Sequence, residues 1–207
     1  MKALSIIIVS TMITAATAGN SFGQKITEMN SEVQVENFNR IKLNSVADVY
    51  FTQGDTYSVK VTGDQEAFDQ SSIRVEKGTL IIDVKDSKQK RVDFNEKQLS
   101  VIVTAKDIQS VRFNGVGSFH CDNQISVNHD VDFKMRGVGS TDIANLKCNK
   151  IGYKNFGVGN AKLTVDCDVI KYKNYGVGSS TIYGKASDIK TKNHGVGQVN
   201  ISNLKFN

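Results

Sequence analysis

Apolar and polar residues alternate over most of this chain, as in the run that contains Val59 and Val61. A period of two turns successive side chains to opposite faces, so the pattern predicts β-strands with one buried face. Residues 64–72 form the only stretch that permits a helix. The dipeptide Lys77-Gly78 separates two alternating runs and predicts a hairpin with a two-residue turn. The charged residues 85–97 predict a loop.

The second half of the chain repeats one pattern at nearly constant spacing. The tripeptide Gly-Val-Gly occurs five times, and its first glycines are separated by 22, 20, 19 and 19 residues. A unit of this length is too short for a strand plus a helix and fits one coil of a β-helix. We therefore predict an all-β fold, a parallel β-helix (solenoid) with coils of 19–22 residues and the usual right-handed connection, preceded by a region of strands and hairpins.

The glycines of the repeats are expected to form the corners of the coils, because glycine permits positive φ and close approach of two backbones. The valine between them is expected to point into the core and to stack as an internal ladder. The segment 43–47 (LNSVA) resembles 113–117 (FNGVG) and predicts a further, weaker copy upstream. The predicted corner residues are Gly115, Gly117, Gly137, Gly139, Gly157, Gly159, Gly176, Gly178, Gly195 and Gly197.

The N-terminus has the features of an export signal. Lys2 precedes an apolar run, and the small residues of 16–18 (ATA) offer a cleavage site; cleavage after Gly23 is the alternative. The apolar run is shorter than the ~20 residues that span a bilayer, which argues against a membrane anchor. The predicted organisation is a signal peptide (1–18), a flexible lead (19–31), an N-terminal β region (32–105) and the repeats (106–207). We expect an exported protein without a transmembrane helix, in the periplasm, at the cell surface or outside the cell.

Basic residues recur at one position of the repeat, three residues before the first glycine. The formal net charge is +5, and residues 107–207 contain 13 Lys and Arg against 8 Asp and Glu. Alternation turns this row outward, where Lys171 and Lys190 extend it. Two interpretations are open: a solvated face that prevents aggregation, or a surface for a polyanion such as an anionic polysaccharide. The row consists of Arg112, Lys134, Lys154, Lys173 and Lys192.

Aromatic residues and asparagines occupy the two positions that follow this row. Phe156, Tyr175 and His194 stand one residue before the glycine and could stack on one another. If exposed, they would suit sugar rings; if buried, they would pack the corner, which is the interpretation we favour here. Asn155, Asn174 and Asn193 stand two residues before the glycine and are expected to bond to the backbone and to each other.

Three cysteines are present, and Cys148 and Cys167 fall at nearly equivalent positions of successive repeats. We interpret them as small buried apolar residues, with a bridge between these two as the alternative in an oxidising compartment. The odd number of cysteines argues against a complete disulfide framework.

No motif for a metal, a nucleotide or another cofactor is found. The three histidines, His120, His129 and His194, do not share a phase of the repeat. Asp166 and Asp168 could face one side of a strand, but the adjacent repeat offers Lys147 and Asn149 rather than further acids. We expect a non-enzymatic protein that binds no specific nucleic acid. The alternatives are a carbohydrate-active enzyme on a β-helix and an element that self-assembles through the solenoid ends.

Several segments together resemble the bacterial head GIN domain family, whose members are described as "putative auto-transporter adhesins". They are 38–54 (FNRIKLNSVADVYFTQG), 57–62 (YSVKVT), 78–82 (GTLII) and the repeated Gly-Val-Gly-Ser/Asn. The resemblance covers about residues 38–200. It implies an exported β-helix-like protein of Bacteroidetes-type bacteria. Taken with the row of cations, this leads us to expect an adhesin or cell-envelope scaffold whose partner is an anionic polysaccharide or another envelope component. The resemblance carries over no catalytic residues.

Overall fold

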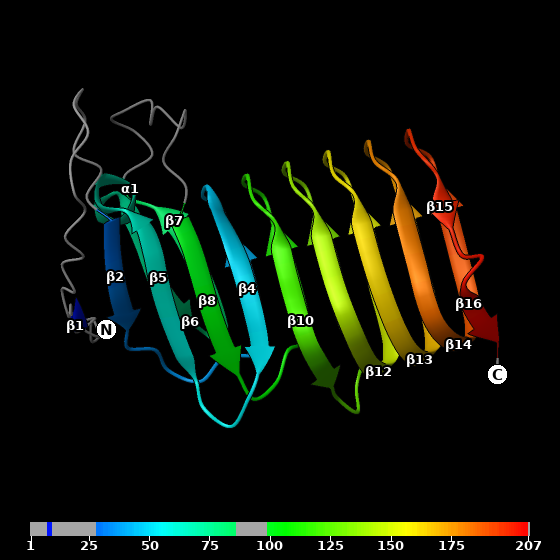
Figure 1. The fold of residues 1–207 in the computed structure, drawn as a ribbon, viewed down its shortest axis with the longest axis horizontal. Coiled ribbons are helices and arrows are strands. Elements are labelled where there is room, and N and C mark those ends of the chain that lie inside the picture. The colour runs from blue at the N-terminus through cyan, green and yellow to red at the C-terminus, as the bar shows by residue number, and fades with distance from the viewer. Residues whose placement is uncertain (1–7, 10–27, 86–98, 207) are drawn as a thin grey trace, which may run out of the picture.

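The structure, a computed structural model, describes residues 8–9, 28–85 and 99–206, and its strands stack into an elongated solenoid (Figure 1). The predicted signal peptide and both cleavage sites lie outside these residues, apart from β1 (Ile8–Val9). The charged stretch from residue 86 also lies outside them. The described chain is nearly all β, a β-solenoid of about five turns, which confirms the predicted fold class.

The N-terminal end of the stack is partly antiparallel. The strands β2 (Glu28–Val33), β5 (Ser58–Asp64) and β8 (Leu99–Ala105) pair in that order with antiparallel register. The predicted flexible lead is therefore wrong for residues 28–31. This segment has few apolar residues, and its strand forms because β5 offers an edge with which it pairs.

A short helix and a hairpin follow β5, as the sequence predicts. The helix α1 (Gln65–Asp69) begins after Asp64, whose side chain accepts a hydrogen bond of 2.9 Å from the backbone N–H of Ala67. The strands β6 (Ser71–Glu76) and β7 (Thr79–Val84) pair antiparallel around a turn at residues 77 and 78, both with positive φ.

The coils are built from two runs of parallel strands. One run joins β8, β4 (Ala47–Gln53), β10 (Phe119–Ser126) and β12 (Thr141–Asn155). The other joins β7, β3 (Arg40–Leu43), β9 (Ser110–Phe113), β11 (Val131–Met135) and again β12. The long strands β12, β13 (Ala161–Asn174) and β14 (Ser180–Asn193) each pass through both runs, and β15 (Val199–Asn200) and β16 (Leu204–Phe206) pair with β14.

The stack includes the weaker upstream copy. Val46 bridges Val116, and Lys42 on β3 is in register with Arg112 on β9. The chain thus joins the same architecture twice, as predicted from the resemblance of the two segments. Between the upstream copy and the repeats, β5 to β8 supply longer strands and a hairpin.

The core is a column of aliphatic and aromatic side chains between the two runs. Phe119, Phe133, Tyr153 and Tyr172 lie one above another, with ring centroids 5.6, 6.3 and 5.3 Å apart. The hydroxyl of Tyr153 lies 3.0 Å from the hydroxyl of Thr141, so this buried polar group has a partner. Burial raises the pKa of Tyr153, which keeps the phenol neutral.

The buried thiols and amides also stack between coils. Cys148 is in register with Cys167, which confirms their equivalent positions, and all three cysteines are buried and free of disulfide bonds. The side chain of Asn155 donates to Asn174 over 2.9 Å, and that of Asn174 donates to Asn193 over 3.0 Å. The same asparagines accept from corner N–H groups two residues on, so their predicted structural role is confirmed.

The corner glycines stand where successive backbones come closest. A Cβ on Gly137 would lie 1.6 Å from the carbonyl oxygen of Gly115, and Gly139 adopts φ +145°. Neither position accepts a larger side chain without moving a coil. Backbone bridges between the valines of successive repeats accompany this close approach.

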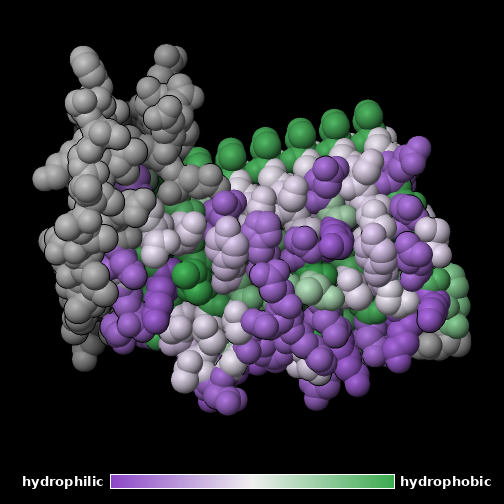
Figure 2. Space-filling view, in the orientation of Figure 1, coloured by the Kyte–Doolittle hydropathy of each residue, from purple (hydrophilic) through white to green (hydrophobic). Residues whose placement is uncertain are grey.

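The valines between the glycines point outward, so the predicted internal ladder is wrong. Val138 is 52% exposed and Val158 51%. The period-two alternation continues through the corner: the residue at 135 and the glycines at 137 and 139 take inward positions, which leaves Val138 on the outside. Figure 2 shows a row of hydrophobic residues along the upper edge of the molecule. Figure 1 shows that the turns of successive coils line up at this edge.

Candidate functional site

One face of the solenoid carries a row of cations that runs from coil to coil. Its members stand on β3, β9, β11 and the last six residues of β12, β13 and β14, and parallel pairing holds them in register. Neighbouring strands are about 4.8 Å apart, so the row is a rigid line of positive charge. It consists of Lys42, Arg112, Lys134, Lys154, Lys173 and Lys192.

Two flanking rows complete what we call the basic face. On one side, two residues earlier in each strand, stand Arg40, Ser110, Asp132, Gly152, Lys171 and Lys190. On the other side, one residue before each corner, stand Asn44, Asn114, Arg136, Phe156, Tyr175 and His194. The three rows together hold ten lysines and arginines and a single acid, Asp132.

The cations of the basic face are largely uncompensated. Of its ten cations, only Lys190 forms an ion pair with another described residue: its Nζ atom lies 3.6 Å from a carboxylate oxygen of Asp188. The pKa of Lys134 is lowered, first by the charge of Arg136, then by burial and by the charges of Arg112 and Lys154. Mutual repulsion of this kind favours an anionic ligand, because the ligand would relieve it.

The aromatic residues of this face are exposed and stacked, which corrects the expectation of corner packing. Phe156 and Tyr175 are each 42% exposed. Their ring centroids are 4.9 Å apart with the planes inclined by 10°, and Tyr175 and His194 are 5.3 Å apart at 13°. The Nζ atom of Lys134 and the guanidinium carbon of Arg136 each lie 5.5 Å from the centroid of Phe156.

This stacking limits what the aromatic strip can do. The rings cover one another's faces, and cations cover the remaining side of Phe156, so the strip presents mainly ring edges to solvent. Sugar rings bind aromatic faces, so Phe156 and Tyr175 do not form a stacking platform. The Tyr175 hydroxyl and the His194 ring nitrogens remain as hydrogen-bonding groups beside the cation row.

The structure brings all five predicted cations together and adds three that sequence reasoning missed as candidates. Lys42 extends the row by one coil, and Arg40 and Arg136 widen the face. A signal for Lys42 was present: it stands three residues before Ser45, which takes the place of the first glycine in the upstream copy.

Of the two aspartates considered for catalysis, Asp166 lies between two lysines. Asp166 is in register with Lys147 on one side and with Lys185 on the other. The Nζ atom of Lys185 is 3.3 Å from an Asp166 carboxylate oxygen. The ion pair with Lys185 favours the charged form of the Asp166 carboxylate and not the protonated form that a general acid needs.

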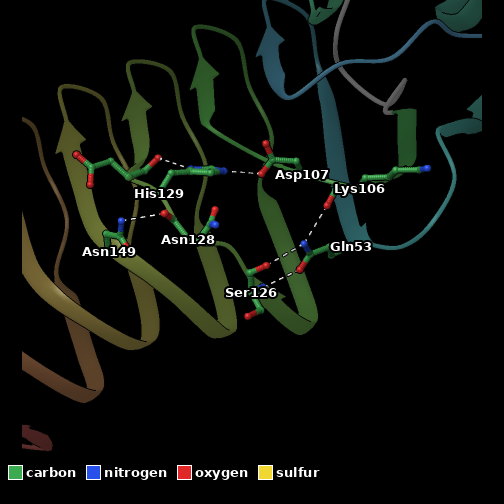
Figure 3. A network of polar contacts seen from close by, with 8 residues as sticks. Gln53, Lys106, Asp107, Ser126, Asn128, His129 and Asn149 are labelled. Carbon is green, nitrogen blue, oxygen red and sulfur yellow. Dashed lines mark hydrogen bonds and ion pairs between the residues drawn. The ribbon is translucent and has the colours of Figure 1, made fainter.

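The three histidines lie in three different places. His120 stacks on Tyr50 with centroids 5.0 Å apart, and His194 belongs to the basic face. His129 belongs to a polar network at the corner opposite the glycines (Figure 3), where its Nε2 lies 2.7 Å from Asp107 and its Nδ1 2.9 Å from the carbonyl of Asp130. Across the described ranges, no three His, Cys, Asp or Glu residues gather as a metal site would require.

The network in Figure 3 joins successive coils. Gln53 donates to the carbonyls of Lys106 and Ser126 and accepts from the N–H of Ser126, while Asn149 donates to the carbonyl of Asn128. These bonds satisfy backbone groups at irregular turns, so the network has a structural role.

Within the described segments, no helix is long and apolar enough to cross a membrane.

Three solved bacterial proteins share this fold. A putative adhesin from Bacteroides fragilis is 22% identical with a TM-score of 0.64, and the match covers 84% of this chain and 97% of that protein. A putative adhesin from Parabacteroides distasonis is 20% identical with a TM-score of 0.77, over 87% and 75%. A putative lipid binding protein from the same species is 20% identical with a TM-score of 0.73, over 87% and 76%.

At these identities the likeness establishes the fold alone. No curated protein shows significant sequence similarity to the chain. Residues 37–207 match the family described as "Putative auto-transporter adhesin, head GIN domain", which confirms the resemblance seen in the opening strands and the repeats. The chain therefore belongs to this head GIN domain family.

Proposed function

We propose that the protein is an exported, non-enzymatic adhesin that binds an anionic polysaccharide along its basic face. The observation that carries the proposal is the composition of that face: ten cations and one acid in three in-register rows. Membership of an adhesin-like family supports a binding role, and the predicted signal peptide supports export.

The geometry suits an extended polymer better than a compact ligand. The cations repeat every ~4.8 Å along the solenoid axis, so a chain laid along that axis meets a new basic residue at each coil. Each exposed contact is weak, and many contacts on one rigid scaffold add without a large ordering cost. Binding of this kind depends on ionic strength, because salt screens exposed charges.

The aromatic edge would refine the recognition. Tyr175 and His194 lie directly beside Lys173 and Lys192, and their polar atoms can accept or donate hydrogen bonds to sugar hydroxyls. The ion-paired setting of Asp166 supports binding without hydrolysis of the polymer.

The test compares two variants that remove equal charge from different faces. Dextran sulfate serves as the probe, and uncharged dextran as the ligand control. The variant K154Q/K173Q/K192Q removes three cations from the basic face, whereas K60Q/K162Q/K205Q removes three exposed lysines elsewhere. We expect the first variant to weaken dextran sulfate binding at least tenfold and the second to change it less than twofold. Equal losses would show that net charge alone governs binding and would contradict the proposal.

A further inference from the structure

The exposed valines form a continuous apolar line that polysaccharide binding does not use. Backbone bridges connect each valine to the next, from the first coil to the last. Five of the six are between 47% and 69% exposed. We call this line, visible along the upper edge in Figure 2, the valine ridge. It consists of Val46, Val116, Val138, Val158, Val177 and Val196.

The shape of the ridge restricts what can cover it. Six positions about 4.8 Å apart give a line about 24 Å long and one side chain wide. It projects from a corner, so a flat protein surface would touch only the valine tips and would bury little area. A deformable medium can surround such a ridge on both sides.

The residues beside the ridge change in a definite order. Just before each corner stand Arg136, Phe156, Tyr175 and His194, and two residues earlier stands the cation row. Moving away from the ridge, the surface is therefore first apolar, then partly aromatic, then cationic. The same order occurs where proteins enter an anionic membrane, with apolar groups among the acyl chains, aromatic groups at the interface and Lys or Arg at the phosphates.

The distances agree with this placement. Lys154 stands four residues before Val158, so the two residues are at most about 13 Å apart along the chain. Interfacial apolar groups enter about 5–10 Å into the headgroup and acyl boundary, so the flexible Lys154 side chain would reach the phosphate layer.

On its other side, the ridge is flanked by uncharged polar residues for most of its length. Ser118, Ser140, Asn160, Ser179 and Gln198 stand there, and several bond to the next coil; the N–H of Ser179, for example, donates to Asn160 over 2.9 Å. The positive charge thus lies on one side, which would tilt the basic face toward the lipid.

We propose that the valine ridge inserts into the surface of an anionic lipid bilayer, with the adjoining cations of the basic face on the lipid phosphates. The inference shares those cations with the proposed function, but the valines belong to it alone. The partner is identified by its chemistry: a fluid apolar layer under a negatively charged surface.

Vesicle binding tests the inference. The probes are phosphatidylcholine vesicles with and without about 30% phosphatidylglycerol, the anionic lipid that attracts basic residues. We expect the protein to bind the anionic vesicles and the variant V138T/V158T/V177T to bind them at least tenfold less. Threonine keeps the β-branched shape, so the corners should still fold. A matched control, Y50T/I102T, removes exposed apolar side chains from β4 and β8, away from the valine ridge. This variant should bind the vesicles like the unaltered protein.

A fluorescent reporter gives a second readout. The chain contains no tryptophan, so V158W introduces a single one at the ridge. We expect its emission to shift to shorter wavelength on addition of anionic vesicles. The emission of Y50W, on β4 and away from the ridge, should not shift. A V158W emission unchanged by vesicles that do bind the protein would overturn insertion of the ridge.

The outcomes separate this inference from the proposed function. A valine variant that loses vesicle binding but keeps dextran sulfate binding supports the inference. A valine variant that binds vesicles as the unaltered protein does would overturn the inference and leave polysaccharide binding standing. Without vesicles, a dimer in sedimentation that the valine variant abolishes would show that a second copy covers the ridge, which would also overturn the inference.

Discussion

Alternation of inward and outward side chains continues through the glycine corners of this fold. Met135, Gly137 and Gly139 take successive inward positions, so Val138 must face outward. The outward orientation could have been obtained from the sequence by counting through the corner instead of assigning an apolar residue to the core by type. The asparagine ladder was predictable because Asn recurs in one phase and bonds well in stacked turns.

His129 gives a prediction at this scale. Both its ring nitrogens face acceptors, the Asp130 carbonyl and the Asp107 carboxylate, an arrangement that the doubly protonated ring satisfies. Burial opposes the charge of His129, but these two partners outweigh burial and raise its pKa above the ordinary value of 6.5. Lys150, paired with Asp130, is the nearby cation.

The sign of the pH effect follows from the raised pKa. The contribution of His129 to folding is fully present below its unfolded pKa and is lost as the pH rises through its folded pKa. We expect the urea midpoint of the protein to fall as the pH rises from below 6.5 through the raised pKa of His129, and the fall to be small because the ring is partly exposed. The variant H129Q should flatten this dependence. An identical pH profile for H129Q would show that other groups cause it.

At the scale of secondary-structure elements, the sequence predicts the strands that have one buried face. Alternation predicted β3 to β9 and the repeats, because one face of each strand is buried and its register is fixed by that face. It did not predict β2, whose residues are mostly polar and which pairs at the edge of β5. It also did not predict that β12, Thr141–Asn155, would pass from one run of strands into the other. That continuity depends on the hydrogen bonds that β10 and β11 offer to β12.

The corner glycines give the prediction for the element scale. Substituting Gly137→Ala places a methyl group 1.6 Å from the carbonyl oxygen of Gly115, so one coil must move away from the next. We expect the free energy of unfolding to fall by about 3 kcal/mol or more. The control Ser140→Ala lies three residues on, where the Ser140 side chain is partly exposed, and should change stability by less than about 0.5 kcal/mol. Similar urea midpoints for the two variants would contradict the steric account of the corner.

At the scale of the whole molecule, parallel stacking converts a residue type repeated at one position into a continuous surface. The cation row could be predicted because its phase is constant in five repeats. Lys42 could have been added to it from the upstream copy, but the width of the basic face could not be predicted, because Arg40 and Arg136 stand outside the repeated basic position. The stacking of Phe156, Tyr175 and His194 could not be predicted either. The same residues at the same repeat position could have adopted side-chain rotamers that keep the rings apart.

The salt dependence of polyanion binding tests the central claim, that the cation row acts as one binding surface. If several cations neutralise the polymer together, the logarithm of the association constant should fall linearly with the logarithm of the salt concentration, with a slope of roughly 0.7 per engaged cation. For dextran sulfate, we expect a steep slope for the unaltered protein and one shallower by about two for K154Q/K173Q/K192Q. The K60Q/K162Q/K205Q control should keep the original slope. A slope that K154Q/K173Q/K192Q leaves unchanged would contradict the assignment of binding to this row.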